Sequence, residues 1–150
     1  MKLAEALNIR ADLQKRINQL RARLLNNAKV LEGGKPAEDP KELLLQLDRC
    51  ADELEKLIAR INRTNCAAVR NGRSITDLIA QRDVLAQKTG VYRDFLNNAS
   101  AVVSRTTKTE LKISPTVDVR KLQKTVDDMS KQYRELDTMI QEINWTTELL

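Results

Sequence analysis

Apolar residues recur every three or four positions along most of the chain, the spacing that places them on one face of an α-helix. This pattern predicts a first helix from about Lys2 to Val30, and Gly33-Gly34 with Pro36 breaks the chain after it. A second helix is predicted from Pro40, because Asp39 is a favourable N-cap and proline is tolerated in a first turn. The predicted seams, meaning the residues along the apolar faces, are Leu3, Ala6, Leu13, Ile17, Leu20 and Leu24 with Leu31 closing the first, and Leu43, Leu47, Cys50, Leu54, Leu57 and Ile61 in the second.

Two further helices follow the same rule. The third is predicted to start at Ser74 or Thr76, and Gly90 weakens its middle by about 1 kcal/mol relative to alanine, so that a break there is one outcome. Asp118 is predicted to cap the fourth helix, which has the most regular seam of the chain. The third seam is Leu78, Arg82, Leu85, Thr89, Tyr92, Leu96, Ala99 and Val103, and the fourth is Val119, Leu122, Val126, Met129, Tyr133, Leu136, Ile140 and Ile143.

The helical period is interrupted twice by short segments typical of strands. Asn71-Gly72 between β-branched residues predicts a hairpin over residues 68–75, because a type I′ turn needs two residues with positive φ. Residues 106–113 alternate like a strand and end before Pro115. A lone strand leaves its backbone groups unpaired, so we expect this strand to pair, within the chain or between chains.

These elements predict a mainly α fold: one helical domain over residues 1–150, with four long antiparallel helices as helical hairpins or a bundle, and a small β element. Residues 1–35 are basic and residues 36–66 acidic, which favours an antiparallel hairpin of the first two helices. The chain has only four aromatic residues, so its core consists of aliphatic side chains in narrow seams. Narrow seams bury little surface, which favours a homo-oligomer over a monomer.

Composition disfavours several functional classes. The chain lacks histidine, the usual general base and the commonest metal ligand, so we expect no enzyme, no cofactor and no metal site. Its net charge of +5 is spread over alternating basic and acidic segments, a pattern that disfavours nucleic-acid binding. Cys50 and Cys66 are predicted in one helix, too far apart for a disulfide. The first residues lack the apolar stretch of a signal peptide and no apolar run is long enough for a bilayer, so we expect a cytoplasmic protein without membrane contact.

One end of the predicted bundle is unusually polar. Arg10 and Arg82 occupy seam positions that leucine holds elsewhere, and a buried arginine needs a carboxylate, carbonyl groups or a bound anion. One interpretation is structural: the arginines pair with Glu5, Asp12, Asp83 or Asp137. The other is a pocket in which arginine binds a small anion, amides give specificity and a tryptophan supplies a stacking wall. The candidate ligand-binding residues are Arg10, Asn62, Asn65, Arg82, Asn144 and Trp145.

Several phrases of the sequence are similar to those of a known family. They are AEALNIRADLQKRI at residues 4–17, INRTN at 61–65, QRDVL at 81–85, SPTVDV at 114–119 and LDTMIQEINWTTEL at 136–149. With them the chain resembles a group of small uncharacterised bacterial proteins often labelled septicolysin. The resemblance implies a helical, cytosolic bacterial or phage-borne protein, and it supplies no activity, cofactor or catalytic residue. The label would imply a pore-forming toxin, which the lack of a spanning segment and of a long amphipathic hairpin disfavours.

Two functional hypotheses result. The first is a non-enzymatic helical-hairpin oligomer that serves as an assembly or interaction module, with a second copy of the chain as its partner. The second is an oligomeric protein that sequesters a small anionic, nucleotide-like ligand at the arginine-bearing end.

Overall fold

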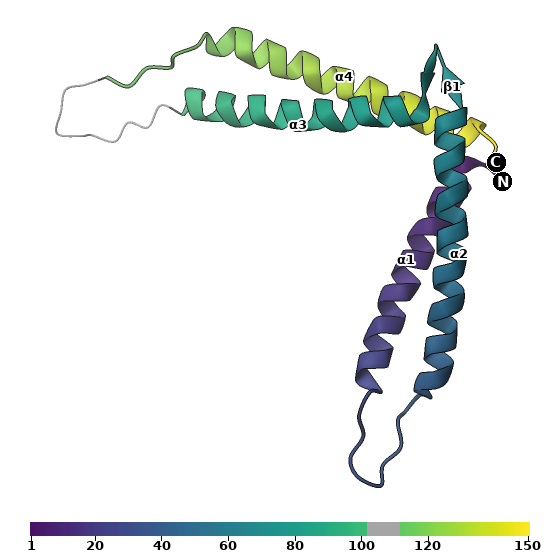
Figure 1. Cartoon of the computed structure of the whole chain (residues 1–150). Coiled ribbons are helices and arrows are strands. Elements are labelled where there is room, and N and C mark those ends of the chain that lie inside the picture. The colour runs from purple at the N-terminus through teal and green to yellow at the C-terminus, as the bar shows by residue number, and fades with distance from the viewer. Residues whose placement is uncertain (102–111) are drawn as a thin grey trace. The chain divides into compact units, whose positions relative to one another are not determined.

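The computed structural model describes residues 1–101 and 112–150, and its fold is mainly α, as predicted (Figure 1). Four long helices account for most of the described chain, and a two-stranded antiparallel sheet lies between the second and third helices in the sequence. The elements are α1 (Leu3–Asn26), α2 (Pro40–Ala67), β1 (Val69–Arg70), β2 (Arg73–Ser74), α3 (Ile75–Ser100) and α4 (Val119–Thr146).

The described residues form two compact units. Unit 1 comprises Met1–Ser74 together with Glu142–Leu150, and unit 2 comprises Ile75–Gln141. Each unit contains a pair of long helices with its own apolar seam, so each is described by itself. The expectation of a single domain stays a prediction.

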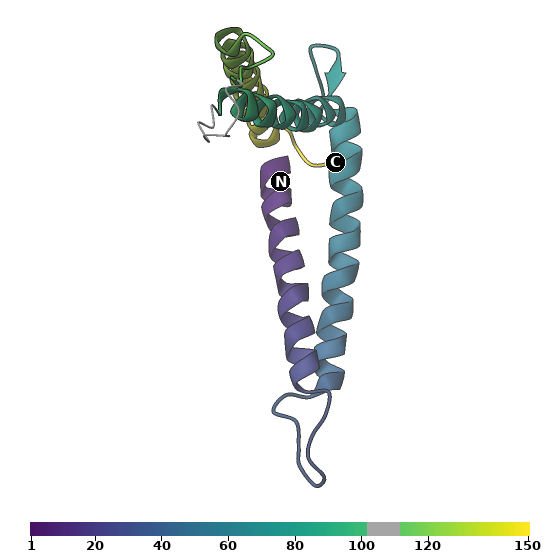
Figure 2. The same ribbon diagram turned by 90° about the vertical axis from the view of Figure 1, so that its left-hand side faces the viewer.

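In unit 1, α1 and α2 lie side by side as an antiparallel hairpin (Figures 1 and 2). Asp39 caps α2 as predicted: its side chain accepts a hydrogen bond from the backbone N–H of Lys41 at 3.0 Å, and Pro40 follows in the first turn. Eight predicted seam residues of this hairpin are buried: Leu3, Ala6, Leu13, Leu20, Leu43, Cys50, Leu57 and Ile61. Ala4 and Thr64 are buried too and were not predicted, whereas the predicted Ile17, Leu24, Leu47 and Leu54 are half-buried.

The end of the first helix differs from the prediction. α1 ends at Asn26 rather than near Val30, and Leu31, expected to close the seam, is 88% exposed. The reason lies in Asn27, which is buried and bonds in two directions. Its amide nitrogen donates to the carbonyl of Arg23 at 2.8 Å, and its side-chain oxygen accepts from the backbone N–H of Glu38 at 3.0 Å. The side chain thus caps the helix and ties the following loop back to it.

The predicted hairpin at residues 68–75 is confirmed. Val69 pairs with Ser74 and Arg70 with Arg73 in antiparallel register. Asn71 and Gly72 have φ values of 53° and 77°, the two positive values that a type I′ turn requires. Of the predicted strand at 106–113, residues 106–111 lie outside the described residues, and Lys112 and Ile113 are not in a strand.

The two ends of the chain meet in unit 1 (Figure 1). The backbone N–H of Leu3 donates to the carbonyl of Thr147, and that of Leu149 donates to the carbonyl of Met1, each at 2.9 Å. The Glu148 carboxylate forms ion pairs with the Nζ of Lys2 at 2.6 Å and with the Met1 amine at 3.1 Å. The hydrogen bonds from Lys2 and then from the amine lower the pKa of Glu148 and outweigh the opposite effect of burial.

Unit 2 is the antiparallel pair formed by α3 and by α4 as far as Gln141. Hydrogen bonds between the helices join Arg82 to Asp137 and Arg93 to Ser130, so the chain directions are opposite. Asp118 caps α4 as predicted, accepting from the backbone N–H of Lys121 at 3.2 Å. α3 continues through Gly90 without a break. The buried residues are Ile75, Leu78, Thr89 and Leu96 on α3, and Val126, Met129, Leu136 and Ile140 on α4. All but Ile75 are predicted seam residues, and the predicted Val103 lies outside the described residues.

Candidate functional site

Five of the six candidate residues from the sequence lie in unit 1. They differ in exposure: Asn144 is buried, Arg10 and Asn65 are half-buried, and Asn62 and Trp145 are exposed. Trp145 is 57% exposed at the last turn of α4. Within the described ranges no hydrogen bond joins any two of these five residues.

Arg82, the sixth candidate, lies in unit 2 and contacts two of the carboxylates named as its possible partners. Its guanidinium donates from Nη1 to Asp137 at 3.0 Å and from Nε to Asp83 at 3.1 Å. Burial by itself lowers the pKa of Arg82, but the hydrogen bonds to Asp83 and Asp137 outweigh it, and the pKa lies above its usual value. The charge of Arg82 is therefore balanced by groups of its own unit.

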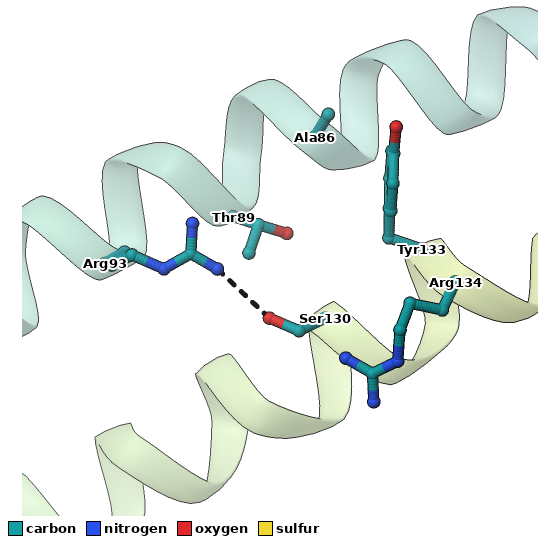
Figure 3. Close-up of a pocket in the computed structure, with 6 residues that line it drawn as sticks. All are labelled: Ala86, Thr89, Arg93, Ser130, Tyr133 and Arg134. Carbon is teal, nitrogen blue, oxygen red and sulfur yellow. Dashed lines mark hydrogen bonds between the residues drawn. The ribbon is translucent and has the colours of Figure 1, made fainter. Parts of the chain in front are cut away.

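A groove between α3 and α4 presents a second, unpredicted arginine site (Figure 3). Its volume is about 300 Å³, at the lower end of the range for pockets that hold small molecules. Its lining residues are Ala86, Thr89 and Arg93 from α3, and Ser130, Tyr133 and Arg134 from α4. In Figure 3 the Tyr133 side chain extends from α4 towards α3, with its hydroxyl group near Ala86.

The polar groups of this groove are arranged so that positive charge is left over. Arg93 donates from Nη2 to the Ser130 hydroxyl oxygen at 3.2 Å, and that hydroxyl donates to the Val126 carbonyl at 2.9 Å. In the part of the chain that the structure describes, neither Arg93 nor Arg134 forms an ion pair with a carboxylate. Two guanidinium groups without an ion-pair partner among the described residues therefore lie beside a mainly apolar groove, an arrangement suited to a small anion that carries an apolar group.

Two acidic side chains that follow Arg134 on α4 already have cationic partners. Asp137 accepts from Arg82, and Glu135 lies 3.8 Å from the Nζ of Lys131. These two are thus engaged elsewhere, whereas Asp127, three residues before Ser130, accepts from the side-chain amide of Gln123 at 2.9 Å.

Sequence reasoning did not find this groove. It assigned Thr89 and Tyr133 to the core seam, and nothing marked Arg93 and Arg134 among many other exposed basic residues. A signal was present nonetheless, because each helix has a small residue, a polar seam residue and an arginine within two turns on one face. These residues are Ala86, Thr89 and Arg93 on α3, and Ser130, Tyr133 and Arg134 on α4. Two such triplets on antiparallel helices face each other across the groove.

A second surface of unit 2 is apolar. Val84, Val91 and Phe95 of α3 are 63%, 64% and 47% exposed. Their spacing of seven and then four residues places them along one line, on a different face of α3 from its buried seam. We call these three residues the outer stripe. Solvent-exposed apolar lines of this kind are typical of surfaces that contact another chain.

Residues 1–101 and 112–150 contain no group of three or more cysteine, aspartate or glutamate side chains placed to hold a metal ion. None of their helices combines the length and the apolar character that crossing a membrane requires. Cys50 is buried and Cys66 exposed, and neither is in a disulfide.

Comparison with known proteins gives a family and a structural relative. The model of a family described as "Family of unknown function (DUF6847)" matches residues 10–149. The chain is also similar to a solved structure, described as the crystal structure of a functionally unknown conserved protein from Corynebacterium diphtheriae. The two share 39% sequence identity and superpose with a TM-score of 0.93, over 100% of this chain and 99% of the other. No curated protein matches.

Proposed function

The chain belongs to DUF6847, a family of unknown function, and we propose that it is a non-enzymatic assembly module whose copies associate through the outer stripe of α3. The observation that carries the proposal is the exposure of Val84, Val91 and Phe95 along one line of one helix. The buried seam of α3 faces α4, so the stripe is left for a contact outside the helix pair. The cytoplasmic location expected from the sequence is part of the proposal.

The charges beside the stripe favour a second copy of the chain as the occupant. Lys88 lies on the line of the stripe, between Val84 and Val91. In an antiparallel pair of α3 helices centred on Val91, Lys88 of one copy lies at the same height along the pair as Asp94 of the other, twice in the symmetric pair. A parallel pair in register would instead bring the two Lys88 side chains together, which is unfavourable. The antiparallel arrangement therefore separates the two Lys88 side chains along the axis and brings opposite charges to the same height.

The thin core of unit 2 supports the same arrangement. Its two helices share one seam, and a single seam between two helices covers only one face of each. Valine and phenylalanine each gain about 1.5–3 kcal/mol when they are fully buried. Six such side chains, three from each copy, lose exposed area when the two stripes meet.

The test is sedimentation velocity of the full chain over a range of concentrations. We expect the wild type to associate and Val91→Glu to weaken the association at least about tenfold, because the two-fold axis places two like charges together. Gln132→Glu, an exposed position on α4, introduces the same charge and serves as the matched control that leaves association unchanged. A wild type that stays monomeric, or an equal effect of both variants, would contradict the proposal.

A second candidate function is the binding of a small anionic ligand, supported by the groove with its two uncompensated arginines. The residues named from the sequence, Arg10, Asn62, Asn65, Arg82, Asn144 and Trp145, remain an alternative site for such a ligand. The septicolysin resemblance adds no activity here, and neither the family description nor that of the solved relative mentions the name.

A further inference from the structure

We propose that the groove between α3 and α4 binds a small phosphate monoester, with Arg93 and Arg134 holding the phosphate and Tyr133 contacting the organic group. This inference deepens the second candidate function, and it does not depend on the association of copies, since the outer stripe shares no residue with the groove.

The charge of the groove defines the class of ligand. Arg93 uses one of its N–H groups on Ser130, and its other donors stay available. Arg134 extends on the other side of Ser130 in Figure 3, and all five of its N–H groups are without a partner in the described ranges. Two guanidinium groups match the double negative charge and the several oxygens of a phosphate monoester. A neutral ligand would leave both charges uncompensated.

The remaining hydroxyl groups refine this assignment. The protons of Ser130 and Thr89 are committed, because each hydroxyl donates to a backbone carbonyl of its own helix, at 2.9 and 2.7 Å. These hydroxyl groups therefore cannot donate to an anion, and the phosphate contacts fall to the arginines. The Tyr133 hydroxyl has no partner in the described part of the chain and is free to donate.

The shape of the groove favours a compact organic group. Tyr133 is half-buried and lines the groove. Ala86 and Ser130 are the small side chains that leave the space open, and the volume of about 300 Å³ suits a single ring rather than a long chain. A flat ring against Tyr133 would gain from aromatic stacking in addition to the phosphate contacts.

The test is a titration of the isotope-labelled full chain with phenyl phosphate, followed by the chemical shifts of backbone amides. We expect saturable binding, with the largest shifts at Ala86, Thr89, Ser130 and Tyr133. Arg134→Gln should weaken binding at least about tenfold, because a charge-assisted contact is lost. Arg49→Gln removes the same charge from an exposed position of α2 and should leave binding within about twofold. Arg93→Gln provides a second groove variant.

Three results would overturn the proposal: no saturable binding, shifts that map outside the groove, or an equal loss in Arg49→Gln and Arg134→Gln. Inorganic phosphate and phenol are titrated in parallel. Inorganic phosphate that binds as tightly as phenyl phosphate would overturn the assignment of an ester, and phenol that does so would overturn the assignment of an anion. The Val91→Glu variant is expected to bind phenyl phosphate as tightly as the wild type does. Binding at the groove and association through the outer stripe are therefore tested independently of each other.

Discussion

Replacing Asp137 by asparagine removes one charge, keeps the size of the side chain, and so probes the contacts that hold Arg82. Arg82 and Asp137 have side chains that are 22% and 36% exposed, and their nitrogen and oxygen atoms lie 3.0 Å apart. A shielded hydrogen bond to a charged group contributes about 1.5–3 kcal/mol, whereas an exposed ion pair contributes about 0.2–1 kcal/mol. This pair is intermediate, and Arg82 keeps Asp83 after the substitution. We therefore expect Asp137→Asn to lower the free energy of unfolding by about 1 kcal/mol.

The assay is urea denaturation followed by circular dichroism, with thermal unfolding as a second measurement. A loss of about 1 kcal/mol corresponds to a fall in Tm of roughly 2–4 °C for a chain of this size. Asp83→Asn is the control: Asp83 has a side chain that is 62% exposed, and we expect it to cost less than about 0.5 kcal/mol. If Asp137→Asn left the free energy of unfolding unchanged, or if Asp83→Asn lowered it more, the shielded contact between Arg82 and Asp137 would not be the stronger of the two.

Three further perturbations test the fold. Gly72→Ala should destabilise the chain by about 1 kcal/mol, because φ is +77° at that position. Gly90→Ala should stabilise it by about 0.5–1 kcal/mol, since Gly90 lies within α3 and a Cβ there would meet no atom within 4 Å. Urea denaturation of both variants checks these opposite signs. Ile140→Ala should cost about 2–5 kcal/mol in the same assay, because its side chain is only 1% exposed and leaves a cavity in the α4 seam. Glu148 has a lowered pKa in the folded chain, so its ion pairs stabilise the fold above the unfolded pKa of about 4.3 and are lost as the pH falls through the folded value. Between neutral and acidic pH, the Tm should therefore fall less in Glu148→Gln than in the wild type. The exposed control Glu55→Gln should show the same fall in Tm as the wild type. An identical fall in Tm in all three proteins would contradict this assignment.

Most of the secondary structure was predictable because its signals are local. The α4 seam, the caps at Asp39 and Asp118 and the turn at Asn71-Gly72 each depend on residues within a few positions of one another. The end of α1 was not predictable in this way. The periodic pattern continues to Leu31, and what ends the helix is the contact of Asn27 with Glu38, across a loop that periodicity does not describe.

The candidate site was harder to predict for a different reason. The sequence argument assumed four helices sharing one polar end, whereas the structure assigns Arg82 to unit 2 and the other five candidates to unit 1. The groove at Tyr133 depends on small side chains opposite each other on two helices, Ala86 and Ser130, and their register is set by packing. The pattern of apolar residues along one helix identifies the face that packs against a neighbour. It does not show where the two packed helices leave a groove between them.

The most direct test of the assembly proposal is oxidative cross-linking of Val91→Cys in a chain whose native cysteines are replaced by Cys50→Ala and Cys66→Ser. A two-fold axis at Val91 brings the two introduced thiols together, so we predict a disulfide-linked pair under mild oxidation. Val69→Cys is the matched control, because Val69 is 62% exposed against 64% for Val91. Rapid linkage at Val91 with none at Val69 is the predicted result, and no linkage at Val91, or equal linkage at both positions, would contradict the association of copies through the outer stripe.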